Sequence, residues 1–134
     1  MIEFQYFETE FVCKENNSKW LKEVINNENK KLGEIVFIFS NDNYLMKNNI
    51  KFLKHDTLTD IITFDYSVGD IISGDVLISI DRVKENAKTY KVSFLNELDR
   101  VMVHGLLHLL GYKDKTKKER KIMTSKEDFY LNIK

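Results

Sequence analysis

Short runs of apolar residues in this chain predict four β-strands. Residues 1–7 alternate apolar and polar side chains, which is the two-residue period of a half-buried strand. Three further runs, at 34–40, 60–66 and 75–80, are too short for typical helices and are rich in β-branched and aromatic residues. Two glycines between 67 and 74 favour a turn, so we expect the last two strands to form a hairpin.

Apolar residues at helical spacing predict five helices around these strands. Four of the helices start near an asparagine, aspartate or serine that can cap the first turn. The helices are expected from Asn16 to near Gly33, from Asp42 through Ile50, from Asp81 to Tyr90, from Ser93 past His108, and from Thr116 onward. The polar stretch from Lys51 to Thr59 is expected to be an exposed loop.

The helix that follows Ser93 has the most regular apolar face. Leu95, Leu98, Met102 and Leu106 recur at intervals of three or four residues, and we expect them to form one line facing the core. Two histidines lie at an angle to this line, on the flank of the same helix. This helix therefore combines a core-facing stripe with polar groups that a cleft could use.

Composition agrees with a folded protein of ordinary type. Hydrophobic residues make up 43% and charged residues 31% of the 134 residues, which argues against disorder and favours one domain, residues 1–134. No stretch approaches the roughly 20 apolar residues of a membrane span, and the first residues are acidic where a signal peptide is basic. We therefore expect a cytoplasmic protein with no membrane partner.

Cysteine and charge counts restrict the chemistry. The chain has one cysteine, Cys13, so an internal disulfide and a CxxC metal site are excluded, and any metal must be held by histidine and carboxylate. Basic and acidic residues cancel at 21 each, so nucleic acid could be attracted only by a local patch. Lys113, Lys115 and Lys117 are candidates for such a patch.

The pattern His104-x-x-x-His108-x-x-Gly111-x-x-Asp114 is the strongest chemical signal in the chain. Histidines four residues apart lie on one helix face, and a glycine three residues later can end the helix. The spacing is that of the metzincin motif HExxHxxGxxH, with Asp114 at the third ligand position and His55 as a rival. Three protein ligands leave a position for water, which is typical of catalytic zinc.

One position in this motif disfavours peptide hydrolysis. The glutamate that acts as general base in zinc peptidases is replaced by Gly105. A metal-bound water and a Lewis acid would remain available, but the cleft must supply its own proton acceptor. The general base is left unassigned.

The chain resembles a known family, the YbeY endoribonucleases or rRNA maturation factors. Residues 104–112 match the family's motif HGxLHLxGY at every fixed position. Residues 56–64 are similar to its DxxTDVLSF segment, residues 74–79 to its GDIxIS strand, and residues 123–127 to its MxxxE pattern. The resemblance extends over about residues 34–134, with these matches in the same order as in the family.

The resemblance implies a fold, a cofactor and a substrate. It implies an α+β domain in which a small four-stranded sheet packs with about five helices, and one zinc ion held by His104, His108 and Asp114. It implies cleavage of single-stranded RNA, in maturation of the small-subunit rRNA 3′ end and in ribosome quality control. The implied partners are rRNA, the small ribosomal subunit and a ribosomal protein, and Asp60 is expected to contact substrate.

Two positions depart from the family pattern. Asp114 stands where the family has its third metal histidine, and this anionic ligand would leave less positive charge on the ion. Leu53 stands where the family has an arginine, which removes a phosphate contact. Arg100 lies one turn before His104 and is the candidate to replace the missing arginine.

Two other functions stay open at this point. A metzincin-like peptidase or amidase would need a carboxylate, supplied from elsewhere, that points at the metal-bound water. A non-catalytic ribosome assembly factor would bind rRNA or a ribosomal protein and use its metal structurally. An open coordination position would argue against this last function.

Overall fold

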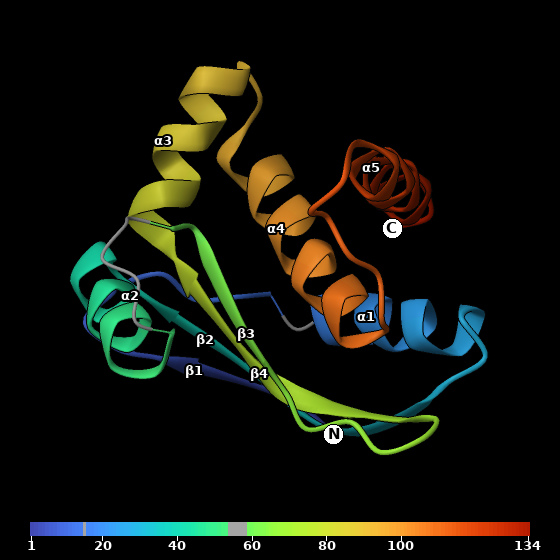
Figure 1. Cartoon of the computed structure of the whole chain (residues 1–134). Coiled ribbons are helices and arrows are strands. Elements are labelled where there is room, and N and C mark those ends of the chain that lie inside the picture. The colour runs from blue at the N-terminus through green and yellow to red at the C-terminus, as the bar shows by residue number, and fades with distance from the viewer. Residues whose placement is uncertain (15, 54–58) are drawn as a thin grey trace.

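The computed structural model describes residues 1–14, 16–53 and 59–134, and for Leu53 it describes the backbone alone. Strands and helices alternate at the start of the chain, and two consecutive strands and then three consecutive helices follow (Figure 1). The elements are β1 (Ile2–Tyr6), α1 (Asn16–Asn27), β2 (Lys31–Ser40), α2 (Asp42–Asn48), a π-helical turn (Asn49–Leu53), β3 (Ile61–Asp65), β4 (Ile71–Ser79), α3 (Ile80–Tyr90), α4 (Phe94–Leu109) and α5 (Lys117–Asn132).

The four strands form one sheet in the order β1-β2-β4-β3. β1, β2 and β4 run parallel, with Phe37 of β2 paired with Val76 of β4, and β3 runs antiparallel to β4 at the edge. The predicted hairpin is therefore confirmed as the β3–β4 pair. The four-stranded sheet with five α-helices also confirms the expected α+β class.

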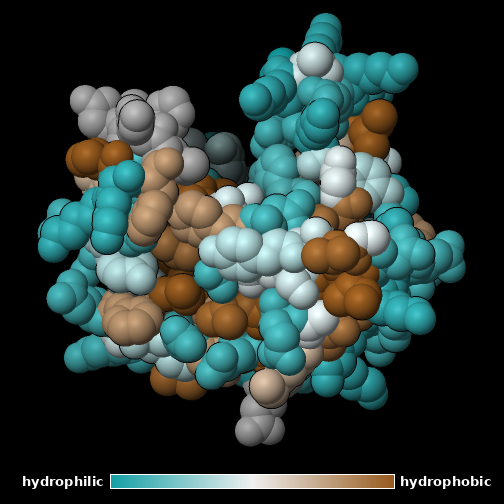
Figure 2. Space-filling view, turned by 60° about the horizontal axis from the view of Figure 1, so that its bottom comes forward, coloured by the Kyte–Doolittle hydropathy of each residue, from teal (hydrophilic) through white to brown (hydrophobic). Residues whose placement is uncertain are grey.

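Alternate residues of the strands face two different layers. Phe37 and Phe39 of β2 point into the main core, which α1, α4 and α5 complete. Ile38, between them, packs with Leu77 and with Leu45 of α2 in a smaller cluster on the opposite face. Figure 2 shows apolar residues exposed among hydrophilic ones when the molecule is viewed from below Figure 1. α4 therefore lies on the face of the sheet that carries the larger core.

The apolar line of α4 is largely as expected. Leu98, Met102 and Leu106 are buried against the sheet, with exposures of 1%, 0% and 0%. Leu95 was expected in the same line, but it is 47% exposed. Leu95 lines a surface pocket together with Phe11 and Val12, which belong to the segment between β1 and α1.

Several predicted boundaries are wrong because strand pairing overrides local signals. α1 ends at Asn27 rather than near Gly33, since Asn29 takes a left-handed conformation (φ +60°). Gly33 lies inside β2, whose first residue pairs with Ile71, and this pairing also places the start of β4 inside the predicted turn at 67–74.

The boundaries around α2 and α3 also differ from prediction. Ser79, rather than Asp81, caps α3 by accepting a hydrogen bond from the backbone of Arg82. Asp81 instead accepts the backbone N–H of Asp42 at 3.1 Å. The predicted loop at 51–59 begins as a π-helical turn, and residues 54–58 lie outside the described residues. Over the described parts of the chain, no helix is long and apolar enough to cross a bilayer.

Candidate metal centre

His104 and His108 lie one turn apart at the C-terminal end of α4. Their ring centroids are 4.6 Å apart and the rings are nearly perpendicular, at 82°. The helix ends two residues before Gly111, whose φ of +104° is accessible to glycine at little cost. The N–H groups of Gly111 and Tyr112 bond the carbonyls of His108 and Leu107 at 3.0 Å, and this Schellman motif turns the chain back.

The turn brings Asp114 to the two histidines. Its Oδ2 atom lies 3.2 Å from Nε2 of His104 and 3.2 Å from Nε2 of His108, and the two Nε2 atoms are 3.0 Å apart. Ligands about 2.1 Å from a tetrahedral ion lie about 3.4 Å from one another, so the spacing suits an ion of the size of zinc. Among the described residues, these three form the one cluster of His, Cys, Asp or Glu with metal-binding spacing.

Each histidine is oriented through its other ring nitrogen. Nδ1 of His104 lies 2.6 Å from Oε2 of Glu127 on α5, and Nδ1 of His108 lies 3.0 Å from the backbone oxygen of Tyr112. These oxygens are acceptors, so each Nδ1 carries a proton and each Nε2 presents its lone pair toward Asp114. Burial acts to lower the pKa of His104, but the hydrogen bond and charge of Glu127, together with the charges of Asp114 and Asp60, outweigh burial and raise the pKa.

A cavity of about 330 Å³ opens beside His104. Burial raises the pKa of two carboxyl groups in its wall, Asp60 and Glu97, and their mutual repulsion raises that of Glu97 further. Nδ2 of Asn86 donates a hydrogen bond of 3.3 Å to Asp60. The cavity is lined by Asp60, Ile61, Tyr90, Glu97, Arg100, Val101, His104, Thr124 and Glu127. Proton-accepting groups therefore adjoin one metal-ligand candidate.

Arg100 lies in the wall of this cavity and is engaged in ion pairs. Its two terminal nitrogens contact Glu127 at 2.8 Å and Asp128 at 2.7 Å. The other oxygen of Glu127 is the one that binds His104. Arg100 thus links α4 to α5 and holds Glu127 in place, in addition to facing the cavity.

The other predicted site residues are placed as follows. Lys113, Lys115 and Lys117 are exposed around the turn that carries Asp114. His55, the rival third ligand, lies outside the described residues, as does the side chain of Leu53.

Gly105 faces the sheet. A Cβ atom at this position would lie 2.7 Å from Ile61 and 2.7 Å from Val76, closer than real side-chain contacts. A glutamate here would collide with these side chains of β3 and β4. The peptidase type of general base therefore has no room at position 105.

Sequence reasoning missed two acidic residues near the centre. Glu97 lies two helical turns before His104, and its seven-residue spacing from that histidine was a usable signal. Glu28 carried no such signal, because it precedes its partner Tyr112 by 84 residues.

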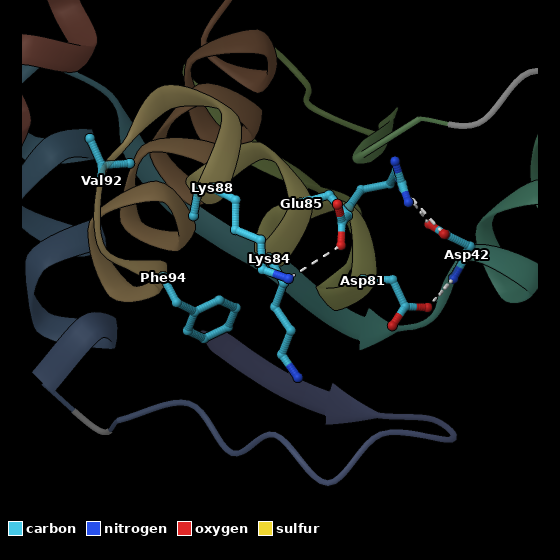
Figure 3. A pocket seen from close by; sticks show the side chains of 9 residues that line it. Asp42, Asp81, Lys84, Glu85, Lys88, Val92 and Phe94 are labelled. Carbon is cyan, nitrogen blue, oxygen red and sulfur yellow. Dashed lines mark hydrogen bonds and ion pairs between the residues drawn. The ribbon is translucent and has the colours of Figure 1, made fainter.

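A larger cavity, of about 530 Å³, lies elsewhere, beside α3 (Figure 3). Four of its charged residues form ion pairs, Arg82 with Asp42 at 3.1 Å and Lys88 with Glu85 at 3.7 Å. Neither histidine nor cysteine lines it. Its lining therefore contains none of the three residues with metal-binding spacing.

The fold and the site define an α+β protein with an HxxxHxxGxxD motif whose side chains have the spacing of metal ligands. The family model described as endoribonuclease YbeY matches residues 3–133, and the chain belongs to this family. Endoribonuclease YbeY of Flavobacterium psychrophilum is 53% identical, covering 99% of this chain and 96% of the relative. That of Bacteroides thetaiotaomicron is 44% identical, covering 92% and 90%.

A solved structure supports the same fold. The solution structure of TM1509 from Thermotoga maritima is 28% identical to this chain, with a TM-score of 0.74. The match covers 98% of this chain and 87% of that protein. The resemblance predicted from sequence motifs is confirmed.

Proposed function

We propose that this chain is a zinc-dependent endoribonuclease that cuts single-stranded RNA in the cytoplasm and matures the 3′ end of small-subunit rRNA. The observation that carries the proposal is the convergence of His104, His108 and Asp114 beside a cavity. Relatives named endoribonuclease YbeY support the substrate class. Residues 1–134 would act as one catalytic domain, with rRNA, the small ribosomal subunit and a ribosomal protein as partners.

In this proposal Nε2 of His104, Nε2 of His108 and Oδ2 of Asp114 would hold the ion. Bound zinc supplies a Lewis acid and lowers the pKa of its water. Glu127 and the backbone oxygen of Tyr112 fix the two imidazole rings, which keeps both Nε2 atoms directed at one point. The remaining groups for the reaction come from the adjoining cavity.

We assign proton transfer to Asp60. Its carboxyl group shares the cavity with His104, and Asn86 fixes one of its oxygens. Burial raises the pKa of this carboxyl group, which makes its carboxylate a stronger proton acceptor. The exposed Lys113, Lys115 and Lys117 would contact the RNA backbone.

The two alternative functions are less well supported. A peptidase of the metzincin type has no general base at Gly105 and would have to use a carboxylate of the cavity such as Asp60, while the names of the relatives favour RNA as the substrate. A purely structural zinc is usually closed by four protein ligands, whereas the described residues supply three and leave a cavity beside them.

Metal content and RNA cleavage, measured on the same preparations, test the proposal. We expect close to one zinc per chain by plasma mass spectrometry, and loss of both zinc and cleavage in His108→Ala and in Asp114→Ala. Asp60→Asn is expected to keep its zinc and to lose cleavage of a single-stranded oligonucleotide by about 100-fold. Wild-type protein that stays metal-free after incubation with zinc, or cleaves RNA equally in chelator, would overturn the proposal.

A further inference from the structure

Glu28, just after α1, is the centre of a polar cluster that reaches the metal turn. Its carboxylate accepts hydrogen bonds from Oη of Tyr112 at 2.5 Å, from Nζ of Lys126 at 3.1 Å and from Oη of Tyr130. Nζ of Lys126 also lies 5.5 Å from the centre of the Tyr112 ring. This Glu28 cluster joins the end of α1 to the turn after α4 and to α5.

Glu28 is held as an anion inside the molecule. Its side chain is 11% exposed, and burial acts to raise the pKa of its carboxyl group. The hydrogen bonds from Tyr112, Tyr130 and Lys126 outweigh burial and lower the pKa overall. Hydrogen bonds to an ionised acceptor are stronger and shorter than neutral ones, so Glu28 restrains its partners firmly.

Tyr112 connects this cluster to the metal site through its backbone. Its carbonyl oxygen accepts the hydrogen bond from Nδ1 of His108 at 3.0 Å, and its N–H closes the Schellman turn on Leu107. Asp114 follows two residues later. A shift of Tyr112 would therefore move both the group that orients His108 and the segment that delivers Asp114.

We infer that Glu28 is a positioning residue of the metal centre, which acts by anchoring the phenol of Tyr112. Glu28 does not line the cavity beside His104. Its effect reaches the ion through two links, the Tyr112 side chain and then the backbone oxygen that binds His108. The inference rests on the proposed metal site.

The chain offers a matched pair of variants for the test. Tyr112→Phe and Tyr130→Phe each remove one phenol hydroxyl from the same carboxylate, but only Tyr112 continues into the metal turn. Zinc dissociation constants would be measured by competition with a chelating dye, at a temperature where circular dichroism shows every variant folded. The visible spectrum of the cobalt-substituted proteins would report ligand geometry independently.

We expect Tyr112→Phe and Glu28→Ala to weaken zinc binding by about 3- to 10-fold and to alter the cobalt spectrum. This is less than the 10- to 100-fold typical of direct partners of a ligand, because one more bond intervenes. Glu28→Gln keeps an acceptor oxygen and is expected to recover part of the affinity, while Tyr130→Phe stays within about twofold of wild type.

Two results would overturn the inference, and they differ from failure of the metal site. Wild-type affinity in Tyr112→Phe, or an equal loss in Tyr130→Phe, would show that the Glu28 cluster supports the fold without positioning the ligands. Wild-type protein that binds neither zinc nor cobalt would instead refute the metal centre itself, and the inference with it.

Discussion

At the scale of single residues, carboxylates with several partners fix the groups around the metal turn. Glu127 uses one oxygen for Arg100 and the other for His104, so a side chain on α5 sets the orientation of a ligand on α4. Glu28 likewise uses one oxygen for Tyr112 and the other for Tyr130. Each carboxylate is partly shielded from water, which strengthens its hydrogen bonds and makes the loss of a partner costly.

Tyr130 gives a pH dependence of stability. Burial and the hydrogen bond to Glu28 raise its pKa to about 12, against about 10 in an unfolded chain. The folded state therefore keeps the proton longer, and the stabilisation is complete below about pH 10 and lost as the pH rises to 12. Between pH 8 and 11, we expect Tyr130→Phe to lose about 1 kcal/mol less stability than wild type in urea unfolding.

The comparison at two pH values separates this effect from the variant's other losses. Removal of the hydroxyl lowers stability at both pH values, so only the difference between them reports the titration. The raised pKa values of Tyr112 and Lys126 contribute to the alkaline loss of stability in wild type and in the variant alike. Equal alkaline losses in wild type and Tyr130→Phe would contradict the prediction.

At the scale of elements, α5 depends on its N-terminal cap. Oγ1 of Thr116 accepts the N–H of Glu119 at 3.1 Å, and Oε1 of Glu119 accepts the N–H of Thr116 at 2.9 Å. This capping box starts α5 soon after Asp114, and α5 then carries Glu127 back to His104. The cap thereby fixes where α5 begins after the turn that carries Asp114, and so where Glu127 meets His104.

Thr116→Ala is expected to lower the free energy of unfolding by about 1 kcal/mol, because it leaves an amide of the first turn without its side-chain acceptor. Thermal or urea unfolding would measure the change. Ser125→Ala, at an exposed position within α5, is the control and should cost nothing, since alanine favours helix interiors. A similar loss in both variants would contradict a role for the capping box.

At the scale of the whole molecule, charge is balanced and attraction to RNA must be local. The formal net charge is zero, so no long-range field favours binding of a polyanion. The exposed lysines around the metal turn are the candidates for this local attraction. Their effect on RNA binding should therefore depend on their position rather than on total charge.

Salt dependence tests this patch. Replacement of Lys113, Lys115 and Lys117 by glutamine is expected to reduce the slope of log affinity against log salt by about 2 for single-stranded RNA, at about 0.7 per lost phosphate contact. Binding would be measured by fluorescence anisotropy with zinc-loaded protein. The control replaces Lys47, Lys51 and Lys84, exposed lysines on or beside α2 and on α3. An equal effect in both triple variants would show that position does not matter.

The sequence by itself determined the features that arise from neighbouring residues. The four-residue spacing of His104 and His108, the helix end at Gly111 and the cap at Ser93 all follow from one or two helical turns, and the structure contains each of them. Asp114 also follows from spacing, because the turn is short. A two-residue period located β1, and short runs rich in β-branched and aromatic residues located the other three strands.

Only the tertiary structure decided which distant groups meet. It placed Glu127 on His104, put Asp60 into the same cavity and joined Glu28 to Tyr112. It also ended α1 early and extended β2, because the hydrogen bonds between β2 and β4 outweigh a local helical pattern. Periodicity and caps record interactions within a few residues, whereas these contacts arise when packing of the core brings separate segments together.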